Sequence, residues 1–261
     1  MIEGSKGQIV VHRWSAEKPT FAAVIVHGYG EHARRYEHVA EALVGEGADV
    51  YAPDHLGHGE SEGERVSIHD MEDLVDDVAR VVEGVREGGL PVVMIGHSLG
   101  GIVAARYAQR DDHGLAALVL SGPVIGGNPD LLGLVNLPEI PEIPIDPSVL
   151  SRDPEVGRAY AEDPLVWHGP FKRETLQAII DSIDAIAAGG SLGDLPTLWI
   201  HGEEDVLAPL AHARPAVERI KGSSFEEKVY PGARHEVFNE TNRDEVIGDV
   251  LAFIRRALPR D

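Results

Sequence analysis

A serine in the middle of a glycine-flanked pentapeptide is the strongest chemical signal in this sequence. Residues 96–100 read Gly-His-Ser-Leu-Gly, which is the G-x-S-x-G pattern centred on Ser98. An apolar run precedes it and a helical pattern follows it. A strand-to-helix turn this tight needs small flanking residues and leaves the serine hydroxyl exposed at the start of a helix, where negative charge is favoured. A plain glycine-rich turn is the alternative, but the strand and helix context favours Ser98 as a nucleophile.

The nucleophile needs a base, because a serine hydroxyl is weakly reactive at neutral pH. The chain contains 13 histidines, so a histidine alone identifies nothing. In chains with this motif, an acid and then a histidine follow the serine on loops after later strands. Asp205 and His235 follow the apolar runs 197–200 and 225–230 in this order. We expect His235 to take the proton of Ser98 and Asp205 to orient the imidazole ring.

Other residues compete for these two roles. Glu203 and Glu204 precede Asp205 in the same loop and are rival acids. His97 should point away from its neighbour at such a turn, and His201 ends its strand before the loop begins, so both are less suitable as the base.

The glycine-rich stretch at residues 27–30 is expected to hold a developing oxyanion. A tetrahedral intermediate needs two N–H donors, and we expect them to be the backbone groups of Tyr29 and Leu99. The stretch 28–33 also fits G-x-G-x-x-A, with Asp54 about twenty residues on, which is a dinucleotide-binding pattern. Glu31 would place a negative charge where a pyrophosphate binds, so the oxyanion reading is favoured.

A metal site is not predicted. His55 and His58 lie three residues apart, but no further ligands follow at a suitable spacing. We expect these rings to hydrogen-bond within their loop. The reaction predicted above requires no cofactor.

The elements that must position these residues are visible as apolar runs alternating with helical patterns. Strands are expected at residues 8–14, 21–26, 48–52, 91–95, 115–120, 197–200 and 225–230. The clearest helix covers residues 71–85, whose apolar residues recur at three- and four-residue steps after a capping Asp70. A second helix includes residues 246–254, with Thr241 as its expected cap. This alternation predicts a mostly parallel sheet with helices on both faces.

One long stretch interrupts the alternation. Residues 122–190 contain no clear strand, and residues 138–147 carry proline at every third position. Such a segment is extended and irregular. It could be a proline-rich ligand for another protein, but its interleaved isoleucines fit an apolar lid better. The sequence therefore predicts the α/β-hydrolase fold, with a core of residues 1–121 and 191–261 and an inserted cap (lid) of residues 122–190.

Composition limits the partners. With 23 basic and 44 acidic residues the net charge is −21, which repels polyanions, so no nucleic-acid partner is expected. The absence of cysteine excludes disulfides and thiolate sites. Residues 1–7 lack the features of a signal peptide, and no apolar run reaches the roughly 18 residues of a membrane helix. A cytoplasmic protein is expected, and its oligomeric state stays open.

Several of these segments together resemble the monoacylglycerol lipases and related lysophospholipase-type esterases. The segments are HGxGEHxxRY at 27–36, DxxGHGxS at 54–61, GHSxGG at 96–101, the stretch 163–166, and the loops 201–205 and 232–236. The resemblance implies hydrolysis of glycerol monoesters of fatty acids through an acyl-enzyme. It also implies a mobile apolar cap that guides the acyl chain and transiently contacts lipid aggregates.

The resemblance also suggests substrate contacts. Glu31 and Arg35 would lie near the site, either shaping a polar pocket for glycerol or forming only a surface ion pair. Tyr29 stands where that family usually has a small residue, which affects the expected acyl-chain preference. The apolar tunnel would be lined by cap residues Leu134, Ile140, Ile143 and Ile145, together with Leu131, Leu132 and Val135.

Other functions share these features. A general carboxylesterase, a lysophospholipase, a C–C bond hydrolase and a proline-type peptidase would use the same three residues, and only the cap would distinguish them. Dehalogenases of this fold use an aspartate nucleophile, so Ser98 argues against them. A non-catalytic ligand receptor on the same scaffold is the alternative from another class, but here all three reactive residues are present in order.

Overall fold

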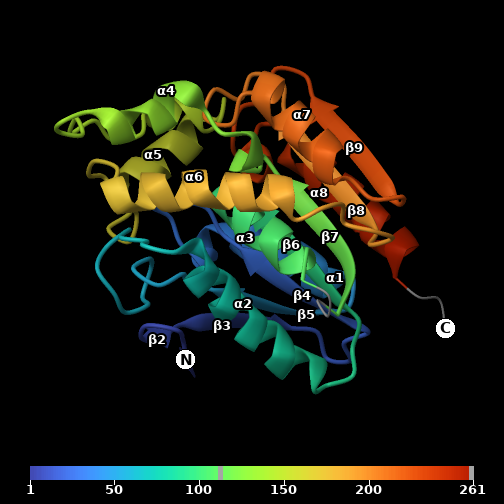
Figure 1. The fold of residues 1–261 in the computed structure, drawn as a ribbon. Helices are drawn as coiled ribbons and strands as arrows, with labels where there is room; N and C mark the ends of the chain where they lie inside the picture. Colours follow the sequence, from blue (N-terminus) through green and yellow to red (C-terminus); the bar gives the residue numbers. More distant parts are fainter. Residues whose placement is uncertain (111–113, 259–261) are drawn as a thin grey trace.

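A seven-stranded sheet forms the centre of the molecule (Figure 1). The computed structural model describes residues 1–110 and 114–258. In spatial order the strands are β3 (Val11–Ser15), β5 (Ala48–Pro53), β4 (Phe21–Val26), β6 (Val92–His97), β7 (Leu115–Ser121), β8 (Thr197–Gly202) and β9 (Phe225–Tyr230). Only β3 runs antiparallel to its neighbour, and every other pair is parallel. The predicted mostly parallel sheet is confirmed.

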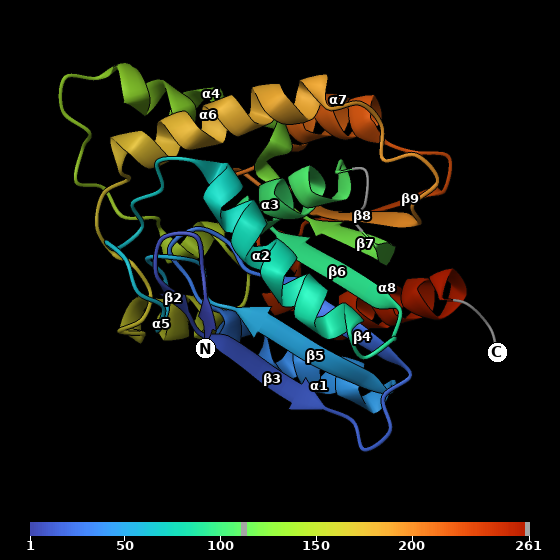
Figure 2. The same ribbon diagram turned by 60° about the horizontal axis from the view of Figure 1, so that its bottom comes forward.

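Both faces of the sheet are covered, and β4 shows why its sequence is apolar throughout. Ala22, Val24 and Val26 pack against the core that includes α2 (Met71–Arg86) and α3 (Leu99–Ala108). The alternate residues of the strand face the opposite core, which includes α1 (Glu37–Gly45) and α8 (Arg243–Ala257). Side chains alternate along a strand, so a strand buried on both faces is apolar at each position. Figure 2 shows these helices on the two sides of the sheet.

The first predicted strand, residues 8–14, is interrupted at Val10. The chain forms β2 (Gln8–Ile9), which pairs with β1 (Ile2–Glu3), and then the edge strand β3. The reason is a distant loop: the Val10 N–H donates to Ser61 Oγ at 2.9 Å, and the Val10 carbonyl accepts the Asp54 N–H at 2.9 Å. Both partners lie more than forty residues away, so the local pattern does not contain this break.

The two predicted helix starts have different outcomes. The Asp70 carboxylate accepts the Glu72 N–H at 2.9 Å and caps α2 as expected. The prediction of Thr241 as the cap of α8 is wrong, because the helix begins after Asn242 without a side-chain cap. The Glu240 carboxylate accepts the Thr241 N–H at 2.9 Å, which holds Thr241 in the turn before the helix.

Residues 122–196, called here the inserted segment, connect β7 to β8 without a strand. Its helices are α4 (Pro129–Leu132), α5 (Pro154–Glu162) and α6 (Arg173–Ala188), which gather over one end of the sheet in Figure 1. The prolines leave residues 141–146 without helix or strand, as expected. In the parts of the chain that the structure describes, no helix is long and apolar enough to cross a membrane.

Candidate active site

Ser98 occupies the sharp turn between β6 and α3 in a strained backbone conformation. Its φ of 54° and ψ of −116° lie in a region that non-glycine residues rarely adopt. The flanking glycines are sterically required: a Cβ on Gly96 would lie 2.4 Å from the Gly100 carbonyl oxygen, and one on Gly100 would lie 2.1 Å from that of Val26. The turn thus projects Ser98 from the carboxyl end of the sheet.

A continuous hydrogen-bond chain joins the three residues expected to react. His235 Nε2 lies 2.8 Å from Ser98 Oγ, and His235 Nδ1 lies 2.7 Å from Asp205 Oδ2. Asp205 Oδ1 accepts the N–H groups of Leu207 and Ala208 at 2.9 and 2.8 Å, which fixes the carboxylate. The loops after β8 and β9 therefore converge on the end of β6.

The competing residues have other partners. Glu203 accepts the Gly232 N–H at 3.1 Å, while Glu204 is exposed. His201 Nε2 faces the Ala208 carbonyl at 2.8 Å, and His97 Nδ1 faces Ser121 Oγ at 3.1 Å. No hydrogen bond links any of these four side chains to Ser98 among the described residues, so the geometry favours Asp205 and His235.

Charge in the site favours an imidazolium at His235. Burial acts to lower the pKa of His235, but Asp205, Glu236 and Glu31 outweigh it and the pKa is raised. Burial acts in the opposite sense on Asp205, yet the adjoining His235 and the Ala208 N–H hold the pKa of this carboxyl below its usual value. The arrangement stabilises the charged form that His235 must adopt on accepting a proton.

The loop after β4 lies directly against the nucleophile. A Cβ on Gly28 would come within 3.2 Å of Ser98 Cβ, so a glycine is needed for this approach. The Gly28 N–H already donates to Glu31 Oε1 at 2.7 Å. Among the described residues, neither the Tyr29 nor the Leu99 N–H has a hydrogen-bond acceptor in the protein. These two donors thus stay available for a ligand.

A buried ion-pair network adjoins the same loop. Arg35 pairs with Glu31 and forms a bidentate pair with Glu236, at 2.8 and 2.7 Å. Only 10% of the Arg35 side chain, 4% of that of Glu31 and 5% of that of Glu236 are exposed. The reading of Glu31 and Arg35 as a mere surface ion pair is therefore wrong. Tyr36 Oη donates to Glu31 Oε1 at 2.6 Å and completes the network.

A cavity of about 50 Å³ opens beside Ser98. Its lining includes the charged residues Glu31, Arg35 and Glu236. Tyr29 and Leu99 also belong to it. The other lining residues are Gly28, His97, Ser98, Val124, Leu131, Ile145, Leu150, Tyr160, Phe171, Ile179, Leu207 and His235. The predicted contacts Glu31, Arg35 and Ile145 thus lie at the cavity.

Five of the seven predicted tunnel residues are absent from the cavity lining, whereas Leu131 and Ile145 belong to it. The five are Leu132, Leu134, Val135, Ile140 and Ile143, and 68% of Ile143 is exposed. The Arg173 guanidinium donates to the carbonyl oxygens of Leu137 and Pro138, at 2.6 and 3.2 Å. These bonds hold the start of the proline-rich strip, residues 138–147, beside the start of α6, while Ile145 near its end lines the cavity. The alternation of prolines and isoleucines alone does not reveal this arrangement.

Sequence reasoning missed lining residues from α5 and α6 and from the stretch before α6. Ile179 lies on a helix whose apolar residues Leu176, Ile179, Ile183 and Ile186 recur at three- and four-residue steps, a signal that was available. Tyr160 and Phe171 had no comparable local signal.

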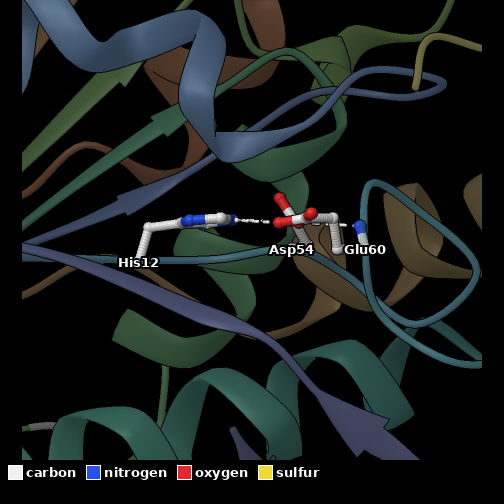
Figure 3. Close-up of side chains that lie close together, drawn as sticks. All are labelled: His12, Asp54 and Glu60. Carbon is white, nitrogen blue, oxygen red and sulfur yellow. Dashed lines mark hydrogen bonds and ion pairs between the residues drawn. The ribbon is translucent and has the colours of Figure 1, made fainter. Parts of the chain in front are cut away.

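The loop after β5 is organised by Asp54, shown in Figure 3. Asp54 Oδ2 lies 3.1 Å from His12 Nε2 and accepts the Glu60 N–H at 2.9 Å, while Oδ1 accepts the Ala33 N–H at 2.8 Å. Ligating atoms of His12, Asp54 and Glu60 lie within 4.8 Å of one another, a grouping of a kind that can hold a cation. Both Asp54 oxygens are already bonded within the protein, so the residue ties two loops together.

The rings of His55 and His58 bond to backbone groups. His55 Nε2 faces the His27 carbonyl at 3.1 Å, and His58 Nδ1 faces the Leu56 carbonyl at 3.0 Å. These contacts give both rings a structural role within the loop.

Comparison with known proteins agrees with this geometry. A family model described as serine aminopeptidase S33 matches residues 17–242. The chain is 37% identical over 260 residues to the monoacylglycerol lipase of Mycolicibacterium smegmatis, covering 95% of this chain and 92% of that protein. It is 33% identical over 235 residues to the monoglyceride lipase of Homo sapiens, covering 85% and 77%. The crystal structure of Paleococcus ferrophilus monoacylglycerol lipase matches with a TM-score of 0.83 and 27% identity, covering 95% of this chain and 100% of that one.

These matches extend over nearly the whole chain and include the turn at Ser98 and the loops of Asp205 and His235. The chain therefore belongs to the serine aminopeptidase S33 family, has the α/β-hydrolase fold and is a serine ester hydrolase.

Proposed function

We propose that this protein hydrolyses monoacylglycerols, with Ser98, His235 and Asp205 as its catalytic triad. The observation that carries the proposal is the hydrogen-bond chain from Ser98 Oγ through the His235 ring to Asp205. Its lipid specificity is supported by relatives named monoacylglycerol lipase or monoglyceride lipase. A cavity lined by both charged and apolar side chains suits a glycerol head and an acyl chain.

The reaction would proceed through an acyl-enzyme. His235 Nε2 takes the hydroxyl proton as Ser98 Oγ bonds to the ester carbonyl carbon, and the N–H groups of Tyr29 and Leu99 bind the resulting oxyanion. The C–O bond to glycerol then breaks, and the leaving oxygen takes the proton from His235. Water, deprotonated by His235, attacks the acyl-enzyme, releases the fatty acid and restores Ser98. Asp205 keeps the ring oriented in both halves of the reaction.

Residues 122–190 would act as a cap over this site. The segment contributes Val124, Leu131, Ile145, Tyr160 and Phe171 to the cavity lining. Its exposed Leu137 and Ile143 are suited to transient contact with lipid aggregates. The cytoplasmic location and the exclusion of nucleic acid stay predictions from the sequence alone.

A general carboxylesterase is the second candidate, because a cavity of about 50 Å³ also suits small esters. A panel of monoacylglycerols, a diacylglycerol, a triacylglycerol, a lysophospholipid and p-nitrophenyl esters separates the two candidates. Monoacylglycerols should dominate, and Ser98→Ala should lower kcat by roughly 10⁶-fold. Cleavage of activated esters alone would overturn the lipid assignment, and a Ser98→Ala variant within tenfold of the wild type would overturn the triad.

A further inference from the structure

Two aromatic rings from opposite sides of the cavity stack on one another. Tyr29 comes from the loop after β4, and Phe171 comes from the stretch just before α6. Their ring centroids are 4.8 Å apart and their planes differ by 15°. Both residues line the cavity beside Ser98. The stack therefore joins the oxyanion-binding loop to the inserted segment across the apolar part of the wall.

Hydrogen bonds between the inserted segment and the core loops hold the two sides together near this stack. The Trp167 N–H donates to the Gly30 carbonyl at 2.7 Å. His32 Nε2 lies 2.9 Å from Asp163 Oδ2, and Arg65 Nη2 donates to the Leu165 carbonyl at 2.5 Å. These bonds fix residues 163–167 against the loops that surround the site. The stretch that precedes Phe171 is thereby held beside the loop that carries Tyr29.

The stacked rings leave little room for an acyl chain. The cavity of about 50 Å³ is far below the roughly 300–1,000 Å³ of pockets that enclose whole small-molecule ligands. The Tyr29 hydroxyl is buried close to the Lys172 backbone, and among the described residues it has no hydrogen bond of normal geometry. A buried unpaired hydroxyl is unfavourable. Packing of the Tyr29 ring against Phe171 must therefore outweigh the free-energy cost of burying the Tyr29 hydroxyl.

We propose that the Tyr29–Phe171 stack limits the length of the acyl chain, so that the preferred substrates are short- and medium-chain monoacylglycerols. The inference rests on the proposed function, because it concerns the apolar part of that same site. Each methylene that a widened pocket buries is worth about fourfold in kcat/KM. Removing one ring, which admits about two further methylenes, should favour longer chains by roughly fifteenfold.

The test measures kcat/KM for butanoyl, octanoyl, dodecanoyl and hexadecanoyl monoacylglycerols with the wild type and Phe171→Ala. The wild type should peak at octanoyl or below, and the ratio of dodecanoyl to octanoyl should rise roughly fifteenfold in the variant. Phe171→Leu serves as a milder second variant should the alanine variant be unstable. Tyr29→Phe removes the hydroxyl but keeps the ring, so this variant should keep the wild-type preference for acyl-chain length. Phe225→Leu on β9, away from the cavity, is the matched control.

The proposed length limit would be overturned if the wild type had the same kcat/KM for the hexadecanoyl ester as for the octanoyl ester. A Phe171→Ala ratio within twofold of the wild type would do the same. Either result leaves ester hydrolysis, and hence the proposed function, standing. Absence of wild-type activity towards every ester in the series overturns the proposed function and the inference together.

Discussion

Arg35 binds Glu236 through two nearly parallel hydrogen bonds, at 2.8 and 2.7 Å, one residue along the chain from His235. The same guanidinium also pairs with Glu31, so two carboxylates share one positive charge in a buried site. This leaves a net negative charge beside the imidazole ring. The network therefore links the loop after β4, which carries Glu31, to the loop that carries His235, the proposed base.

Replacing one of these carboxylates should change the pH dependence of the reaction. Glu236 is among the groups that raise the pKa of His235, after Asp205. Glu236→Gln removes its charge, so the pKa of His235 should fall. His235 acts as the base only when neutral, and the acidic limb of kcat/KM should therefore move to lower pH. Stopped-flow or steady-state assays from pH 4 to 9 measure this shift.

The matched control is Glu226→Gln, which removes a carboxylate of an exposed ion pair with Arg256. Its acidic limb should coincide with that of the wild type. A limb that moves to higher pH in Glu236→Gln would contradict the electrostatic role of this network.

Gly28 provides a steric test of the approach of its loop to Ser98. A methyl group there would lie 2.9 Å from Glu31 Oε1 and 3.2 Å from Ser98 Cβ. Gly28→Ala must displace the loop that carries the Tyr29 N–H, and small displacements of a catalytic group cost about 10²-fold. We expect kcat for a short ester to fall by roughly this factor, while circular dichroism shows a folded protein.

Gly84→Ala is the corresponding control, because a Cβ at this exposed position of α2 meets no atom within 4 Å. It should keep full activity and raise the free energy of unfolding by up to about 1 kcal/mol. A Gly28→Ala variant within fivefold of the wild type would show that the loop tolerates the methyl group and does not contact the reacting atoms closely.

The sequence predicts the parts of this molecule that depend on local pattern. The strand at Phe21–Val26 is recognisable because both faces of it are buried, and the strained turn at Ser98 is recognisable because glycines must flank it. Asp205 and His235 could be proposed as the partners of Ser98 because parallel strands end at the same edge of the sheet, where their loops must converge. Their geometry agrees with these predictions.

Features that depend on distant contacts were not predictable in this way. The carbonyl oxygens of Leu137 and Pro138 are held by Arg173, 36 and 35 residues later in the chain, and Ile143 a few residues further on is exposed. Phe171 reaches the cavity because Trp167 is bonded to Gly30. An isolated phenylalanine between a proline and a lysine gives no indication of such a position. The packing of the inserted segment is therefore the part that needs a structure.

Buried neutral histidines should make the protein sensitive to acid. Burial lowers the pKa of His27 to about 3 and those of His58 and His97 to about 4, and it also lowers the pKa of His55. In the unfolded chain these rings bind protons below a pKa of about 6.5. Above that pKa these rings do not lower the free energy of unfolding. As the pH drops towards the pKa values of the folded protein, the free energy of unfolding falls by about 2 kcal/mol per histidine at pH 5. His235, whose pKa is raised, acts in the opposite direction and offsets part of this loss.

Urea denaturation at pH 8, 6.5 and 5 measures this effect, and His58→Asn tests its origin. The asparagine amide can donate to the Leu56 carbonyl in place of His58 Nδ1 and does not titrate in this range. The loss of unfolding free energy between pH 8 and pH 5 should be about 2 kcal/mol smaller in this variant. His69→Asn, at an exposed position, should leave the loss unchanged. Equal losses in the wild type and His58→Asn would mean that the ring is already charged in the folded protein, contrary to its burial.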